Sequence, residues 1–373
     1  MKRADLARAR RIVVKLGTSL LAPQAGGVQT RRFAAIARQV AAQMRAGREV
    51  VVVASGAVGL GTRRLGLAKR PSSIPGKQAA AAVGQIDLCR RFERAFAREK
   101  LLVGQILLDH AGFVDRERFL NARRTLAQLL ADRVVPLINE NDSVATEELR
   151  FGDNDQLAAQ VVNTCGADLL ILLTDVAGLR DRDPRAAGRA TRVAEVDEVT
   201  PRVLALAGGE GSPLGTGGMR SKLLAARAAG RFGVPTVIAD GRRRDVLARI
   251  LDGDDVGTLV RPAEDQLSSR KHWIAFTLKP RGALQLDAGA VRALRERRAS
   301  LLPAGVTEVR GRFGVGDLVA CLTSDGEEIA RGLVSYDARE IERIKRLKTA
   351  QIHPTLGYSN GDEVIHRDNL IVF

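Results

Sequence analysis

The feature that most constrains the fold is an alternation of short apolar runs with longer stretches rich in Ala, Leu and Arg. It continues from the start of the chain to about residue 260. The apolar runs lie at 11–17, 49–55, 101–109, 134–139, 167–175 and 235–240. Continuous apolar strands separated by helices indicate a mostly parallel sheet that is buried on both faces. The predicted fold class is therefore α/β, a three-layer sandwich.

The length of the chain and a change of pattern near residue 260 predict a second domain. A chain of 373 residues exceeds what one ordinary hydrophobic core supports. The segment 263–275 is polar and irregular, and the sequence after it is rich in β-branched runs and turn residues. We predict a first domain at 1–262, a linker at 263–275 and a small, mainly β domain at 276–373.

Composition excludes several classes of protein. The formal net charge of +16 raises the hypothesis of nucleic-acid binding, but the basic residues are scattered, so we interpret the charge as compositional bias. The three Cys and four His residues are dispersed, which argues against a disulfide scaffold and against a His/Cys metal cluster. No stretch resembles a signal peptide or a membrane span, so we expect a cytoplasmic protein without membrane contact.

The ends of the apolar runs carry most of the chemistry-bearing residues. In open parallel sheets, ligands bind beyond the carboxyl ends of the strands, where helix N-termini point their amides. The sequences at or near these ends are KLGTS, ASGAV, NENDSV and LLTDVAGL, and a Gly-rich segment, GSPLGTGGMRSK, lies between the last two strands. Together they supply two lysines, backbone amides and hydroxyl groups. This combination favours the binding of phosphate groups.

The common nucleotide-binding signatures are absent from the sequence. There is no GxxxxGK[ST] motif, and no GxGxxG motif follows the first predicted strand. The sequence therefore argues against a P-loop site and against a dinucleotide site of the Rossmann type.

Six motifs in the same order and spacing resemble the amino-acid kinase superfamily and, within it, the glutamate 5-kinase family. They are KLGTS, ASGAV, NENDSV, FGDND, LLTDVAGL and GTGGMRSK. The segments PRGALQLDAGAVRAL, SLLPAG and FGVGDLV further resemble a PUA domain. The resemblance covers nearly the whole chain, and the collinear set is far more specific than any one of its motifs.

The resemblance implies ATP-dependent phosphorylation of the side-chain carboxylate of L-glutamate to L-glutamyl 5-phosphate, the first step of proline synthesis. It also implies Mg²⁺ held mainly through the ATP phosphates rather than by protein ligands, inhibition by L-proline, and a homo-oligomer, either a dimer or a tetramer. The chemistry agrees, because a carboxylate with a pKa of about 4.3 is already ionised at neutral pH and needs no general base. The protein must instead hold two anions together.

The resemblance also assigns site residues. Lys15 and Lys222 would be the catalytic lysines that contact ATP phosphates. The other ATP-binding residues would be Thr174, Asp175, Thr216, Gly217, Gly218, Met219, Arg220 and Ser221. Ser55, Asp142 and Asn154 would bind glutamate, so that NEND and GDND form two sides of one pocket.

Four neighbouring residues receive supporting roles. The amides of Gly56 and Ala57 suit the α-carboxylate of glutamate, and Ser55 beside them is also a candidate helix N-cap. One of Asp153 and Asp155 could orient Lys15 through an ion pair or cap the following helix as an N-terminal acid. We favour a supporting or capping role for Asp155, and Asp153 is a candidate substrate contact.

Two rival hypotheses remain. One is RNA binding through the PUA domain, which is less favoured because the aromatic residues that would stack on bases, Trp273, Phe313 and Tyr336, are isolated in the sequence. The other is a sibling kinase that acts on carbamate, acetylglutamate, aspartate or a uridine nucleotide. The FGDND segment and the PUA domain point away from those siblings.

Overall fold

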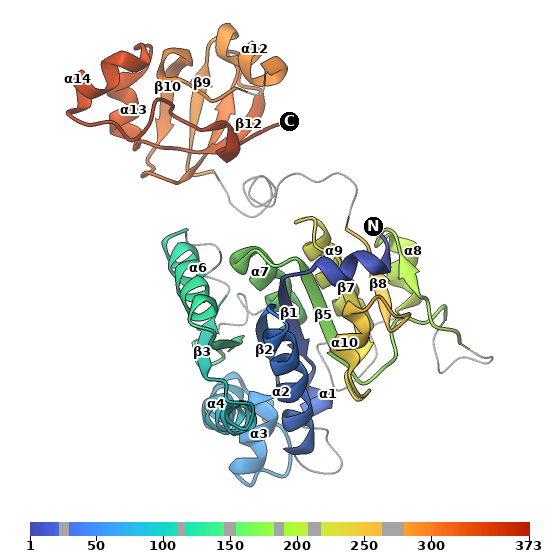
Figure 1. Cartoon of the computed structure of the whole chain (residues 1–373). Coiled ribbons are helices and arrows are strands. Elements are labelled where there is room, and N and C mark those ends of the chain that lie inside the picture. Colours follow the sequence, from blue (N-terminus) through green and yellow to red (C-terminus); the bar gives the residue numbers. More distant parts are fainter. Residues whose placement is uncertain are drawn as a thin grey trace. The chain divides into compact units, whose positions relative to one another are not determined.

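The computed structural model describes residues 1–21, 30–109, 113, 116–144, 154–182, 190–207, 218–262, 280–297 and 299–373. They belong to two compact units, Met1–Gln266 and Leu267–Phe373 (Figure 1). Each unit has its own sheet and its own buried apolar clusters. The segment 263–275, which the sequence predicts as a linker, lies outside the described residues.

The first unit is built on a mostly parallel sheet, which confirms the predicted fold class. Its strands follow the order β3-β4-β2-β1-β5-β7-β8-β6 in the described part of the chain, and of these neighbouring pairs only β7–β8 is antiparallel. The strands are β1 (Arg11–Leu16), β2 (Glu49–Ala54), β3 (Val103–Leu108), β4 (Val135–Glu140), β5 (Leu169–Thr174), β6 (Glu195–Val196), β7 (Thr236–Asp240) and β8 (Thr258–Val260). Strand β1 therefore lies at the centre, between β2 and β5.

Helices cover both faces of this sheet, as the apolar strands require. Because side chains alternate along a strand, Val14 and Leu16 of β1 enter one core with α2, α4 and α10, whereas Val13 enters a second core with α6, α7 and α9. The helices are η1 (Arg3–Arg8), α1 (Thr18–Leu21), α2 (Thr30–Arg45), α3 (Ala57–Arg64), α4 (Ile74–Ala97), α6 (Arg116–Ala131), α7 (Asn154–Cys165), α8 (Pro201–Leu206), α9 (Met219–Gly230) and α10 (Val246–Leu251). Lys15 is two residues after Val13 and therefore lies on the same face of the strand, toward α7 and α9.

Helices α3 and α4 cross at very short range through two glycines. A Cβ atom added to Gly61 would lie 1.6 Å from the carbonyl oxygen of Ala80, and one added to Gly84 would lie 1.8 Å from that of Ala57. Only glycine allows this approach at either position. The crossing fixes the start of α3, directly after Ser55, against the middle of α4.

The second unit has a five-stranded sheet in the order β10-β9-β11-β12-β13 among the described residues, with β9 and β11 parallel and the other pairs antiparallel. Its elements are β9 (Gly282–Leu286), α12 (Ala288–Arg297), η3 (Pro303–Gly305), β10 (Val306–Gly311), β11 (Leu318–Leu322), β12 (Glu328–Leu333), α13 (Ala338–Ile344), η4 (Thr349–Gln351), α14 (Ile352–Leu356), η5 (Arg367–Asn369) and β13 (Leu370–Val372). A small, separate β-rich domain is therefore confirmed.

The aromatic residues of the second unit differ from expectation in one respect. Tyr336 is not isolated, because its ring lies 6.5 Å from that of Tyr358. The ring of Tyr336 is fully buried and its hydroxyl donates to the carbonyl oxygen of Gly361, while Phe313 is also buried. Buried rings cannot stack on bases, and Trp273 lies outside the described residues. These placements give no support to RNA binding.

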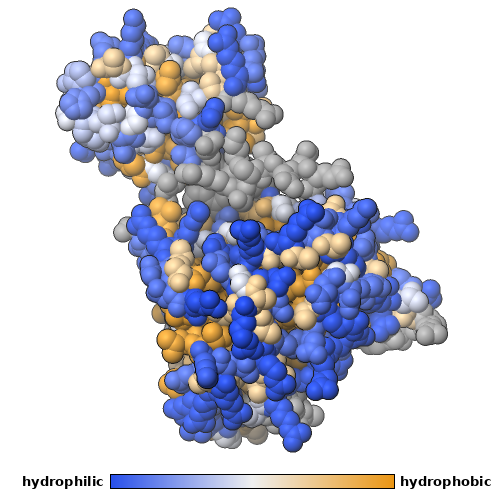
Figure 2. All heavy atoms as spheres, in the orientation of Figure 1, coloured by the Kyte–Doolittle hydropathy of each residue, from blue (hydrophilic) through white to orange (hydrophobic). Residues whose placement is uncertain are grey.

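The surface of the first unit is largely hydrophilic, with an apolar area on the side where α6 and β3 lie (Figure 2). Strand β3 is the last strand at its edge of the sheet. Leu107 in this strand and Leu102 just before it are exposed. Among the described residues, no helix is long and apolar enough to cross a membrane.

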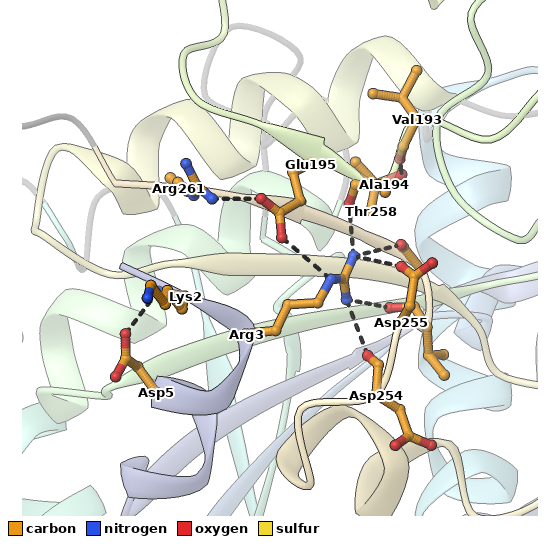
Figure 3. Close-up of polar contacts among 12 residues, drawn as sticks. Lys2, Arg3, Asp5, Val193, Ala194, Glu195, Asp254, Asp255, Thr258 and Arg261 are labelled. Carbon is orange, nitrogen blue, oxygen red and sulfur yellow. Dashed lines mark hydrogen bonds and ion pairs between the residues drawn. The ribbon is translucent and has the colours of Figure 1, made fainter.

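The N-terminal segment is tied to the opposite edge of the sheet by the partly buried guanidinium group of Arg3 (Figure 3). It donates to the carbonyl oxygens of Ala194 at 2.6 Å, Val256 at 3.0 Å and Gly257 at 3.0 Å. Two carboxylates balance its charge, Glu195 at 3.5 Å and Asp255 at 3.4 Å. Burial lowers the pKa of Arg3, and these carboxylates oppose the shift. One side chain thus joins η1 to the segments around β6 and β8.

Replacing Arg3 by Met should therefore destabilise the first unit. The substitution removes three hydrogen bonds from a charged donor, although Ala194 keeps the amide of Leu259 and Gly257 keeps Arg192 as donors. We expect the free energy of unfolding to fall by about 2–3 kcal/mol, because hydrogen bonds from a charged group are among the stronger ones. Arg8→Met in the same helix is the matched control, because that side chain is 85% exposed. Denaturant titration of both variants gives the comparison, and equal stability of the two would contradict this role for Arg3.

Candidate active site

The carboxyl ends of the central strands bring most of the predicted residues to one edge of the sheet. Leu16 at the end of β1 is paired with Ala54 of β2 and is flanked on its other side by Leu173 of β5. Thr174 of β5 is in turn paired with Asp240 of β7. Because these strands are parallel, the loops that follow them, and the helices that those loops begin, meet above β1.

At the centre of this edge, one carboxylate bridges two lysines. Oδ1 of Asp155 lies 2.5 Å from Nζ of Lys15, and Oδ2 accepts a hydrogen bond of 3.0 Å from Nζ of Lys222. All three side chains are buried, with residue exposures of 0% for Asp155 and 3% for each lysine. They come from the first turn of α7, the penultimate residue of β1 and the first turn of α9. We call these three residues the lysine bridge.

The electrostatics of the lysine bridge favour an anionic ligand. Burial opposes ionisation of Asp155, but the ammonium groups of Lys15 and Lys222 outweigh this effect and hold its pKa below the ordinary value. An ionised carboxylate between two ammonium groups leaves one positive charge in excess. Buried positive charge of this kind attracts anions, so these three residues are suited to an anionic ligand.

The structure pairs Asp155 with Lys15, one of the alternatives from the sequence, and also places it in the first turn of α7, where an acid at the helix N-terminus was the other alternative. Sequence reasoning offered a contact with Lys15 as one alternative and did not anticipate the contact with Lys222. Asp153, Thr216 and Gly217 lie outside the described residues. Of the remaining Gly-rich segment, Gly218 is the N-cap of α9, and Met219, Arg220 and Ser221 form its first turn together with Lys222.

On the side of β2 and β4, Asn154 is anchored by its amide nitrogen. The Nδ2 atom donates to the carbonyl oxygen of Ala54 at 2.8 Å and to Oδ1 of Asn139 at 2.7 Å. Asp142 lies in the turn after β4 and is half-buried. These contacts place Asn154, next in sequence to Asp155, between the ends of β2 and β4.

The start of α3 completes this side. Gly56 is the N-cap residue and has a φ of 113°, a conformation that favours glycine, so the alternative that Ser55 is itself the N-cap is wrong. Ser55 is half-buried directly before the cap, and Ala57 is the first residue of α3. The amides at this helix start are suited to a carboxylate.

On the side of β5 and β7, Thr174 is buried and its hydroxyl donates to Oδ1 of Asp175 at 3.1 Å. Sequence reasoning missed the adjoining loop. The amide of Gly241 donates to the carbonyl oxygen of Thr174 at 2.8 Å, and Arg242 pairs with Asp240 at 2.8 Å. The hydrogen bonds from Arg242 hold the pKa of Asp240 low despite partial burial. This loop follows the apolar run 235–240, so the rule that ligands bind at strand ends would have selected it as well.

Among the described residues, no three His, Cys, Asp or Glu side chains gather in a way that could hold a metal ion. The lysine bridge, the polar groups beside Asn154 and Thr174, and the starts of α3 and α9 bring positive charge and hydrogen-bond donors to one edge of the sheet, an arrangement suited to anions.

Comparison with known proteins agrees with this arrangement. Residues 10–240 match the model of the amino acid kinase family, and residues 282–356 match that of the PUA domain. The chain therefore belongs to the amino acid kinase family and carries a PUA domain. Its fold is that of this family, and the chain is a kinase.

Curated relatives that match over almost the whole chain are named glutamate 5-kinase. That of Moorella thermoacetica is 48% identical over 99% of this chain and 98% of its own length. That of Citrifermentans bemidjiense is 46% identical over 100% of both chains. A solved structure titled UMP kinase from Bacillus anthracis has a TM-score of 0.49 at 18% identity, covering 68% of this chain and 96% of its own.

Replacing Asp155 by Asn should abolish most activity and reduce stability. The substitution removes the carboxylate charge that Lys15 and Lys222 share in a buried position, which should lower the free energy of unfolding by about 3–5 kcal/mol. Activity should fall by about a hundredfold or more, because the lysines lose their fixed positions. The control is Asp87→Asn, which breaks a half-exposed pair with Arg91 at 3.0 Å.

The stability difference should also depend on pH. Because the folded-state pKa of Asp155 lies below its ordinary value of 3.8, its stabilisation is fully present above that value. It should be lost only as the pH falls through the lower, folded-state pKa. Denaturant titrations of wild type and Asp155→Asn should therefore differ by a constant amount from about pH 5 to pH 8 and converge in stronger acid. A difference that shrinks already near neutrality would contradict this assignment.

Proposed function

We propose that this chain transfers the γ-phosphoryl group of ATP to the side-chain carboxylate of L-glutamate and forms L-glutamyl 5-phosphate, the first step of proline synthesis. The observation that carries the proposal is the lysine bridge, in which Asp155 holds two ammonium groups at the junction of two polar sides. Relatives named glutamate 5-kinase, which match over almost the full length of the chain, support the choice of glutamate. A cytoplasmic location is part of this proposal.

The two sides of the site divide the substrates between them. Thr174 and Asp175, with the start of α9 and the segment before it, bind the nucleotide. Ser55 and the amides of Gly56 and Ala57 bind the α-carboxylate of glutamate. Asp142 and Asn154 supply acceptors for its α-ammonium group, and Asp153 adds a further contact. The side-chain carboxylate of glutamate then points toward Lys15.

The chemistry needs positioning and charge stabilisation rather than proton transfer. The acceptor carboxylate is already ionised, so no residue must remove a proton from it. Lys15 and Lys222 reduce the repulsion between this carboxylate and the γ-phosphate, and they stabilise charge as it moves to the leaving oxygen. Mg²⁺, bound through the ATP phosphates, supplies additional positive charge when present. The sequence expectation of no protein metal site stands as part of this proposal.

Two further properties belong to the proposal. L-Proline, which shares the α-carboxylate and an α-nitrogen with glutamate, inhibits by occupying the amino-acid side. The chain forms a homo-oligomer, a dimer or tetramer, through the first unit. The exposed Leu102 and Leu107 beside the edge strand β3 supply apolar surface for that contact.

The direct test is to trap the product. Glutamyl 5-phosphate is an acyl phosphate, and hydroxylamine converts it to a hydroxamate that can be measured by its iron complex. We expect hydroxamate formation that requires ATP, Mg²⁺ and L-glutamate together. Carbamate, N-acetylglutamate, aspartate and UMP serve as alternative acceptors in an ADP-release assay. ADP release with one of these, and none with L-glutamate, would overturn the proposal.

A reciprocal pair of variants should separate the two sides of the site. Asp142→Ala removes a charged acceptor for glutamate, so the KM for glutamate should rise about 10- to 100-fold while that for ATP changes less than about threefold. Asp175→Ala should show the opposite pattern. Steady-state kinetics with each substrate varied in turn gives both constants. A rise in the KM for ATP in Asp142→Ala would mean that the two sides are misassigned.

A further inference from the structure

A chain of side-chain amides connects Asn154 to the interior of α4. Nδ2 of Asn154 donates to Oδ1 of Asn139 at 2.7 Å, and Nδ2 of Asn139 donates to Oε1 of Gln85 at 2.8 Å. Nε2 of Gln85 in turn donates to Sγ of Cys89 at 3.4 Å, one helical turn further along α4. The chain runs from α7 through the end of β4 to α4, and Asn139 at its middle is 2% exposed.

The direction of the hydrogen bonds along this amide chain is set by a backbone carbonyl group, which can only accept a hydrogen bond. The second hydrogen on Nδ2 of Asn154 is donated to the backbone carbonyl oxygen of Ala54 at 2.8 Å. A carbonyl oxygen has no proton to donate, so the nitrogen of Asn154, and not its oxygen, must face β2. Asn139 must then turn its oxygen toward Asn154 and its nitrogen toward Gln85, and Gln85 must turn its oxygen toward Asn139.

This direction decides what Asn154 can offer to a substrate. Both hydrogens of its amide nitrogen are committed to protein acceptors, namely Ala54 and Asn139. The group that remains for a ligand is the Oδ1 atom, an acceptor. An acceptor at this position suits an ammonium group and disfavours a carboxylate. The amide chain thus defines the polarity of this side of the pocket.

We propose that Gln85 is a positioning residue of the amino-acid side, which acts through Asn139 to fix the orientation of Asn154. The inference rests on the proposed function, since it specifies how that site recognises the α-ammonium group. Gln85 is suited to this role because it follows Gly84, the residue at which α4 meets α3 without space for a Cβ atom. The same crossing fixes the start of α3, so one contact aligns the helix start beside Ser55 and the amide chain.

Loss of the oxygen of Gln85 has a defined consequence. The buried Nδ2 of Asn139 would lose its acceptor, and rotation of the Asn139 amide to relieve this would turn its nitrogen toward the nitrogen of Asn154. Two facing donors repel, so Asn154 would no longer keep its oxygen directed at the substrate. Replacing Cys89 by Ala leaves these hydrogen-bond directions unchanged, because the carbonyl group of Ala54 determines them.

The test uses the full-length chain and three variants. Gln85→Met keeps the length of the side chain and removes its acceptor, and Gln85→Leu is a second variant of different shape. Cys89→Ala, on the same helix and equally half-buried, is the control for disturbance of α4. For each protein, the KM for L-glutamate, the KM for ATP, kcat and the thermal midpoint are measured with the hydroxamate assay and a melting curve.

We expect the KM for glutamate to rise about tenfold in both Gln85 variants, with the KM for ATP and kcat within about twofold of wild type. Cys89→Ala should leave all three constants near those of wild type. The inference is overturned if the KM for glutamate stays within twofold in the Gln85 variants, if the KM for ATP rises equally, or if Cys89→Ala gives the same rise. Absence of glutamate-dependent hydroxamate with the wild-type chain is a different result, which overturns the proposed function itself.

Discussion

The shared carboxylate of Asp155 is the interaction on which the rest of the site depends. Two ammonium groups at 3% exposure would repel each other and lose hydration without a counter-charge between them. Asp155 supplies that charge with one oxygen for each lysine. To meet it, Lys15 must come from the central strand, Asp155 from α7 and Lys222 from α9. The close packing of α7 and α9 over the same face of β1 satisfies this condition.

The strand order explains why two different ligands can meet at this point. The chain builds β2, β3 and β4 on one side of β1 and then crosses through α7 to β5 on the other side. Such a reversal opens a crevice at the carboxyl ends of a parallel sheet. Asn154 and Asp155 begin the helix that makes the crossing, so one faces the β2–β4 side and the other faces the centre. The β5–β7 side, with Thr174, is left for the second ligand.

The sequence predicts the sheet better than it predicts the contacts. Apolar runs determine which segments are strands, and the rule that ligands bind at strand ends selects Lys15, Ser55, Asp142 and Thr174 without knowledge of strand order. The contact between Lys222 and Asp155 joins residues 67 positions apart and depends on how α7 and α9 pack, which no local pattern encodes. The role assigned to Gln85 is equally hidden, because a glutamine inside an Ala-rich helix is typical of a solvated position.

Two other differences between the structure and the prediction from the sequence have similar causes. Arg3 lies in a basic N-terminal segment that looks solvated, yet its side chain is largely withdrawn from solvent, because the carbonyl groups that accept its hydrogen bonds come from residues about 190 and 250 positions away. Tyr336 and Tyr358 are 22 positions apart in the sequence and come together only when the second unit folds. In each case a polar or aromatic side chain is placed by tertiary contacts rather than by the periodicity of its own segment.

The geometry of the lysine bridge also bears on why lysine, and not arginine, occupies both positions. A lysine ammonium group carries three N–H donors that rotate about one bond. Under the proposed function, each lysine would keep one donor on Asp155 and direct the others at phosphate oxygens. A planar guanidinium group that paired with Asp155 through two donors would have a fixed plane and could not follow a phosphoryl group as it moves. Because Asp155 holds both ammonium groups before any substrate binds, the positive charge is already in place when the transfer begins. Catalysis by such a site then needs little reorganisation of the protein, which is the condition under which fixed charges stabilise a transition state most strongly.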